Sequence, residues 1–245
     1  MTQRTDALLL FLLWVLILGA SSSEAAGPLL SDMNGPIKNK HNLSSLNTGV
    51  TYRAQVNPAD PRSTQICIFC HTPHNAVPQT ALWNRRDPTR FFGHYSTPTL
   101  TIDDPTVRPV SQYGEPNGSS RLCLSCHDGQ TALGAVWNGP AIQFASGTDK
   151  IAYLNLSSHH PVSFVYNTAV LGMIQIKKPD EGYQLPIGSP YVKLDKMNRM
   201  QCTSCHDPHQ DQSITPDVTT PFWAGPTHDD VCMACHNITP LPANP

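Results

Sequence analysis

The stretch CIFCHTPH at residues 67–74 holds two cysteines three positions apart, a histidine directly after them and a second histidine after a proline. Its first five letters follow the pattern Cys-x-x-Cys-His, which occurs four times and uses all eight cysteines of the chain. On one helical turn, positions i, i+3 and i+4 share a face, so both thiols and the imidazole can reach one flat ring system. The pattern is typical of covalent attachment of c-type haem. The four units occupy residues 67–71, 123–127, 202–206 and 232–236.

Four covalently bound haem c groups are therefore expected, each held by two thioether bonds and by an iron bond to the adjacent histidine. A single unit would also suit a zinc half-site or a redox dithiol, so a zinc or disulfide scaffold is the alternative for the set. The expected thioether residues are Cys67, Cys70, Cys123, Cys126, Cys202, Cys205, Cys232 and Cys235. The expected proximal iron ligands are His71, His127, His206 and His236.

The chain begins with the features of a secretory signal, and residues 1–25 are expected to be removed as a signal peptide. Arg4 precedes an unbroken apolar run at residues 7–19, and Ser23-Glu24-Ala25 fits a small-x-small cleavage site. The run is shorter than the roughly 20 residues of a membrane span, with an uncleaved anchor as the alternative. No later segment is apolar enough to span a bilayer. We expect an exported protein, outside the cell or at its surface, with the periplasm as the alternative.

The composition does not suit a conventional layered core. The 23 prolines are spread along the chain and break it into short pieces, while only 7% of the residues are aromatic and 14% are charged. We therefore expect a mostly irregular chain wrapped around four closely spaced haems, with short helices at the units and little sheet. The formal net charge is −2 and no basic patch is present, which argues against nucleic acid as a partner.

Histidines are numerous enough to give every iron a second axial ligand. The chain has 11, of which four are proximal. Methionine is the usual competitor, but a sufficient supply of imidazoles favours bis-histidine iron of low potential. Such iron leaves no open position for substrate, so we do not expect an enzyme. The remaining histidines are His41, His74, His94, His159, His160, His209 and His228.

The first and third units both continue with x-Pro-His, which ends in His74 and His209. Proline disfavours helical geometry at the residue before it, so each helix should end near the proximal histidine. The second histidine then leaves the face of its own haem and is expected to bind a neighbouring haem.

The chain also reads as two similar dihaem halves, residues 26–150 and residues 151–245. In the simplest assignment, each half supplies the second histidine ligand of its own two irons. This assignment gives His160 preference over His159, because Pro161 holds His160 extended, and it treats His94 and His228 as structural. The expected sixth ligands of the first to fourth irons are His41, His74, His160 and His209, respectively.

His41 precedes Cys67 on a segment rich in Asn, Ser and Pro. Fully extended, such a tether reaches roughly 85–95 Å. His41 could therefore bind an iron in another copy of the chain and join haem chains end to end. Ligation within the same chain is the alternative.

The strings at residues 67–76, 121–129, 160–164 and 201–209 resemble those of exported multihaem c-type cytochromes. They are most similar to tetrahaem subunits of extracellular cytochrome filaments, or nanowires, of metal-respiring bacteria and some archaea. The resemblance covers roughly residues 36–245. It implies closely spaced haems with bis-histidine iron, polymerisation through end-to-end haem contacts, and ligation across the subunit boundary.

The expected function is electron transfer from haem to haem outside the cytoplasm, in a conductive filament that serves redox proteins, minerals, electrodes or other cells. The alternative is a monomeric periplasmic shuttle between a membrane quinol oxidase and a reductase. A multihaem reductase would need an iron with an exchangeable site, against which the supply of histidines argues.

Overall fold

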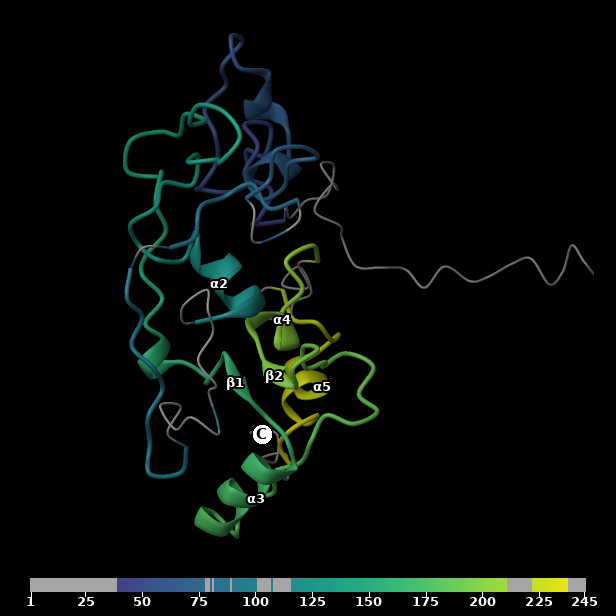
Figure 1. Cartoon of the computed structure of the whole chain (residues 1–245). Helices are drawn as coiled ribbons and strands as arrows, with labels where there is room; N and C mark the ends of the chain where they lie inside the picture. The colour runs from purple at the N-terminus through teal and green to yellow at the C-terminus, as the bar shows by residue number, and fades with distance from the viewer. Residues whose placement is uncertain are drawn as a thin grey trace, which may run out of the picture.

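The computed structural model describes residues 39–77, 80, 82–88, 90–100, 107, 116–210 and 222–237. The expected signal peptide lies outside these residues. Most of the described chain is irregular, with short helices and one sheet of two strands, so the expectation of little regular structure is confirmed (Figure 1). The elements are η1 (Pro61–Thr64), η2 (Cys67–Phe69), α2 (Gly118–Leu124), η3 (Leu156–Ser158), β1 (Phe164–Val165), α3 (Thr168–Lys177), β2 (Arg199–Met200), α4 (Cys202–Cys205) and α5 (His228–Cys232).

Short helical elements do occur at the units. The first unit begins in η2, the second lies at the end of α2, the third forms α4 and the fourth begins at the end of α5. α3, the longest helix of the described residues, contains none of the units. It starts at Thr168 because the side chain of Asn167 caps it, accepting hydrogen bonds from the backbone N–H groups of Ala169 and Val170. No helix in the described ranges is long and apolar enough to cross a membrane.

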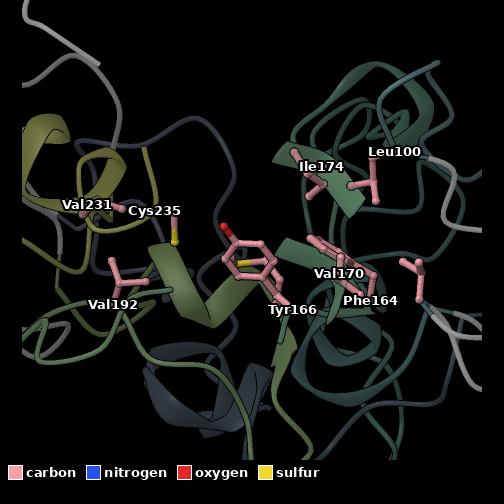
Figure 2. Close-up of a cluster of buried hydrophobic side chains, with 10 residues drawn as sticks. Leu100, Phe164, Tyr166, Val170, Ile174, Val192, Val231 and Cys235 are labelled. Carbon is pink, nitrogen blue, oxygen red and sulfur yellow. The ribbon is translucent and has the colours of Figure 1, made fainter. Parts of the chain in front are cut away.

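One hydrophobic cluster lies around the sheet and α3. β1 and β2 pair antiparallel, with Phe164 opposite Met200. Val170 and Ile174, four residues apart on α3, face the same cluster. Figure 2 draws this cluster, with Tyr166 near its middle. Its buried members are Leu100, Val107, Phe164, Tyr166, Val170, Ile174, Val192, Met200, Val231 and Cys235.

A second cluster lies in the N-terminal part of the described chain, and Cys70 and Cys126 pack against it. The N-terminal and C-terminal parts meet where α2 contacts α4, near the middle of the view (Figure 1). Polar contacts join the two helices. The hydroxyl of Ser120 donates to Oε1 of Gln201 at 2.7 Å and accepts from the backbone N–H of Cys202 at 3.0 Å. The buried members of the second cluster are Leu43, Ala54, Phe69, Leu133, Val136 and Ile142.

Candidate cofactor-binding site

All four Cys-x-x-Cys-His units close the same backbone turn. In each unit the N–H of the histidine donates to the carbonyl oxygen of the first cysteine, which is the i to i+4 bond of a helical turn. This turn places the two cysteines and the histidine on one side of the backbone, as the sequence pattern predicts. The four N···O distances are 2.7 Å at His71, 3.1 Å at His127, 3.0 Å at His206 and 2.9 Å at His236.

The helical turn stops at the proximal histidine in the two units that continue with x-Pro-His. α4 ends at Cys205, and His206 is extended, with φ −123° and ψ 134°. In the first unit, η2 ends at Phe69, and His71 forms a β-bridge with Trp83. The expectation that these helices end near the proximal histidine is confirmed, because the residue before a proline avoids the helical region.

Consecutive units lie close to one another in space. Cys70 of the first unit and Cys126 of the second pack against the same hydrophobic cluster. The thiols of Cys123 and Cys202 are hydrogen-bonded, which joins the second unit to the third. Cys205 of the third unit packs against the cluster that contains Cys235 of the fourth. Groups bound at consecutive units would therefore be neighbours.

Three of the four proximal histidines face a second histidine at nearly the same distance. The ring centroids of His71 and His209 are 6.2 Å apart, with an interplanar angle of 16°. The other two pairs are nearly perpendicular. They are His41 with His127, at 6.3 Å and 76°, and His160 with His236, at 6.2 Å and 87°.

This distance fits an iron between two imidazoles. Metal–nitrogen bonds of about 2.0 Å on both sides would separate the centroids of two opposed rings by roughly 6.3 Å. Packed ring pairs span a range that includes this distance: the centroids of His41 and Phe222 are 4.1 Å apart, and those of Phe91 and His94 are 6.1 Å apart. The residues present therefore fit the group that the sequence implies.

The hydrogen bonds of the second histidines fix which ring nitrogen remains for a metal. The Nδ1 atoms of His41, His160 and His209 all lie against oxygen acceptors that have no proton to give. Each Nδ1 must then be the donor, which leaves the lone pair on Nε2 in the neutral ring. Metal-binding histidines generally use their other nitrogen in this way. The three contacts are His41 to the carbonyl of Pro208 at 3.3 Å, His160 to the carbonyl of Pro161 at 3.1 Å and His209 to Oδ1 of Asp207 at 3.2 Å.

The electrostatic surroundings keep the proximal imidazoles of these pairs neutral, which is the form that binds a metal. Burial and then the charge of His41 lower the pKa of His127 to about 4. The pKa of His71 is lowered by burial and by His209, and that of His236 by burial and by His160.

The pairing differs from the sequence-based assignment. We expected His41 at the first iron, but its ring lies beside His127 of the second unit. His160 was expected at the third iron and lies beside His236 of the fourth. His209 was expected at the fourth iron and lies beside His71 of the first, so the histidine pairs do not close within each half. The sequence-based assignment grouped histidines by their place in the sequence, whereas the folded chain brings His71 and His209 together from different halves.

His41 is not at the end of an extended tether. Its ring stacks on Phe222 at 4.1 Å with an interplanar angle of 10°. A compact turn holds the segment, since the side-chain amide of Asn47 donates to the carbonyls of Asn39 and Asn42. Both Asn42 and Asn47 are fully buried. The structure therefore places His41 against residues of its own chain.

The other expected ligand, His74, is exposed. Its backbone carbonyl accepts hydrogen bonds from Thr72 and Asn138, and within the described residues its ring contacts no proximal histidine. His159 and His160 are both exposed, and each has Nδ1 against a backbone carbonyl. Of the two, His160 is the one whose ring lies beside that of His236.

Aromatic residues beside the proximal histidines were missed by the sequence analysis. Trp83 and Trp223 form β-bridges with His71 and His206, and their rings lie 5.7 Å and 4.9 Å from those imidazoles. Tyr183 bridges His236 in the same way, with its ring at 5.2 Å. The signal was present, because a tryptophan follows each Cys-x-x-Cys-His-x-Pro-His stretch.

Among the described residues, no three His, Cys, Asp or Glu side chains gather closely enough to hold a metal ion by themselves. The eight cysteines form no disulfide. Instead, three pairs of histidines lie close together, and each pair includes the histidine of a Cys-x-x-Cys-His unit. A scan against models of protein families and a search of curated proteins found no match for the chain.

Proposed function

We propose that the chain is a tetrahaem c-type cytochrome that transfers electrons from haem to haem outside the cytoplasm. The observation that carries the proposal is the set of three histidine pairs with centroids 6.2–6.3 Å apart, each containing a proximal histidine of a Cys-x-x-Cys-His unit. In each pair the second histidine comes from a distant part of the sequence, and the spacing is compatible with an iron between the two rings.

Within this proposal the residues of the chain hold and orient the cofactors. The eight cysteines would bind the haem edges, and the paired histidines would supply both axial ligands at the first, second and fourth units. Trp83, Trp223 and Tyr183 support the proximal rings from the side. A bound haem supplies a one-electron couple, whose potential the protein adjusts through ligands, burial and charge.

Electron transfer is favoured over substrate chemistry because a second imidazole lies beside the proximal one at three of the four units. His41, His160 and His209 have their Nδ1 atoms held by backbone or carboxylate oxygen, which orients each ring. The closeness of consecutive units supports transfer from one haem to the next.

A subunit of an extracellular filament is the form to which the resemblance of the sequence points. A monomeric shuttle in the periplasm is the second candidate, and one observation favours it. His41, the residue that suggested a bond between copies, lies beside His127 of its own chain. A haem chain that continues from one copy to the next would then need a contact other than His41.

The first test is the haem content of the holoprotein, produced in a host that attaches c-type haem. We expect four haems per chain that survive acid–acetone extraction, with low-spin signals in electron paramagnetic resonance. A chain that loses its colour on extraction would contradict the proposal.

Electron microscopy of native material sheared from cells would then separate the two forms. Filaments whose subunit mass matches the chain would support the filament subunit. Discrete particles confined to the periplasmic fraction would support the shuttle.

A further inference from the structure

The tryptophan that follows the first unit is held by a backbone clip, which consists of two hydrogen bonds on either side of it. The N–H of Thr72, directly after the proximal histidine, donates to the carbonyl of Leu82 at 2.8 Å. The N–H of Asn84 donates to the carbonyl of Cys70 at 2.9 Å. Trp83 lies between these two bonds, so its backbone is part of the frame of the first unit.

The third unit repeats this backbone clip around Trp223. The N–H of Asp207 donates to the carbonyl of Phe222, and the N–H of Ala224 donates to the carbonyl of Cys205, both at 2.8 Å. The residue before each tryptophan has a left-handed backbone, with φ +62° in the first unit and +65° in the third. This conformation is uncommon for residues other than glycine, so the clip holds both tryptophans in a defined place.

The two clips present their indole rings to the proximal histidines in different orientations. Trp223 stacks on His206, with ring centroids 4.9 Å apart and an interplanar angle of 9°. Trp83 stands nearly perpendicular to the ring of His71, at 5.7 Å and 81°. Both arrangements are favourable ring contacts, so packing against the histidine accounts for the rings but not for the indole N–H groups.

The indole N–H of Trp83 is buried without an acceptor. Its Nε1 atom is closed off from solvent and, in the part of the chain that the structure describes, has no hydrogen-bond partner. An indole nitrogen can only donate, and burial without a partner costs it the hydrogen bond that it made to water. Buried tryptophans therefore usually find an acceptor, which here has to come from a bound group or a water molecule.

Polar side chains around this indole are paired within the protein. The side chain of Asn84 donates to a carbonyl between the two cysteines of the first unit at 2.6 Å and accepts from the backbone N–H of Asn138 at 2.9 Å. The hydroxyl of Thr72 donates to the carbonyl of His74 at 2.7 Å and accepts from the side chain of Asn138 at 3.1 Å. The indole of Trp83 differs from these neighbours, although it lies closest to the proximal histidine.

We propose that the indole N–H of Trp83 donates a hydrogen bond to a propionate carboxylate of the first haem. Haem c carries propionate side chains, and a carboxylate suits this donor because hydrogen bonds to an ionised acceptor are stronger than those between neutral groups. Trp83 adjoins His71, the expected proximal ligand of that haem. The inference rests on the proposed function, and it makes Trp83 a residue that binds the cofactor as well as one that supports His71.

The test is nuclear magnetic resonance of the reduced holoprotein, in which low-spin iron is diamagnetic, with isotopically labelled tryptophan. The chain has four tryptophans, of which Trp14 lies in the expected signal peptide. The indole signals of Trp83, Trp137 and Trp223 are each assigned by their loss in W83F, W137F or W223F. If W83F does not retain its haems, the signal of Trp83 is assigned by elimination, and the contacts in the wild type decide.

We expect nuclear Overhauser contacts between the indole proton of Trp83 and the methylene protons of a propionate. The same proton should exchange with solvent roughly tenfold or more slowly than that of Trp137, whose side chain is 38% exposed. A proton that contacts only water or protein groups, or that exchanges as fast as that of Trp137, would overturn the inference.

Resonance Raman spectroscopy of the haems gives a second readout with a matched control. W83F removes the donor from the first unit, and W223F makes the same substitution in the equivalent clip of the third unit, where the indole stacks on His206. W83F should shift part of the propionate bending band, and W223F should leave the band unchanged. Equal behaviour of the two variants would show that Trp83 has no special contact with a propionate.

Failure of the inference is distinguishable from failure of the proposed function, because the haem content of each sample is measured first. A protein with four covalent haems and no contact between Trp83 and a propionate overturns only the role of the indole. A wild-type chain without covalent haem overturns the proposed function before any contact is sought.

Discussion

The ring of His209 lies 6.2 Å from the ring of His71 and nearly parallel to it, although the two residues belong to the third and the first unit. Nδ1 of His209 is held by the carboxylate of Asp207 at 3.2 Å. The third unit therefore contributes its x-Pro-His histidine to a site that the first unit begins.

Replacement of His209 should remove an axial ligand from the first haem. We expect H209A to retain four covalent haems, because the thioether bonds are untouched, but to convert one iron to the high-spin form. Electron paramagnetic resonance of the oxidised protein measures this change. H228A is the control, since the side chain of His228 is 66% exposed and pairs with Asp229. Four low-spin irons in H209A would show that this pairing is wrong.

The neighbours His159 and His160 provide a matched test at the fourth haem. Only His160 lies beside His236, while His159 bonds to the carbonyl of Asn155. H160A should therefore give one high-spin iron, and H159A should leave the spectrum of the wild type. The opposite result would assign the ligand to His159.

Gly118 should be essential for the contact between α2 and α4. Its φ is +57°, and a Cβ atom there would lie 2.6 Å from Nε2 of Gln201, a side chain that is almost fully buried. G118A should lower the free energy of unfolding by about 1–3 kcal/mol, through backbone strain and displacement of Gln201. Chemical denaturation of the holoprotein measures the change.

G172A is the matched control for G118A. Gly172 lies within α3 at an ordinary φ, and a Cβ there would meet no atom within 4 Å. Alanine should stabilise this helix by about 0.5–1 kcal/mol. A loss of stability in G172A as large as that in G118A would contradict the role given to Gln201.

Asp195 should make stability depend on pH in the acid range. Burial raises its pKa, but hydrogen bonds from the backbone of Arg199 and Met197 and from the side chains of Gln201 and Arg199 lower it overall. The lowered pKa in the folded state means that the ionised form stabilises the fold above the unfolded pKa of about 3.9. This contribution is lost as pH falls through the folded pKa.

D195N should therefore be less stable than the wild type by about 1–2 kcal/mol at pH 7, with the difference vanishing at strongly acid pH. Thermal unfolding at both pH values measures it. D180N is the control, because Asp180 is exposed in the turn after α3. A difference that persists unchanged in acid would show that the charge of Asp195 is not the cause.

Features that depend on local geometry could be predicted from the sequence. The turn from Cys202 to His206 forms because five residues suffice for an i to i+4 bond, and Pro208 ends the helix. The low content of sheet follows from the frequent prolines. The start of α3 is also encoded locally, by the capping side chain of Asn167.

Tertiary pairings could not be read from the sequence. Nothing near His209 indicates that His71 is its neighbour, because their contact depends on how the whole chain folds back. The compact turn around His41 depends on buried asparagines, which in a sequence look like those of a solvated loop. The repeats suggested that each half closes its own histidine pairs, whereas the pair of His71 and His209 joins one half to the other.

If the chain is exported and binds haem as proposed, the pairing of His71 with His209 also bears on the order in which it matures. A chain that emerges from a translocation channel N-terminus first presents its first attachment unit long before its third. His209 reaches the outer side only after most of the polypeptide has crossed. The first haem would then be attached early but would wait, with one axial side open, until the last quarter of the chain arrives. During that time the open axial side of the first haem would have to be protected by the assembly machinery, because the folded protein does not yet exist.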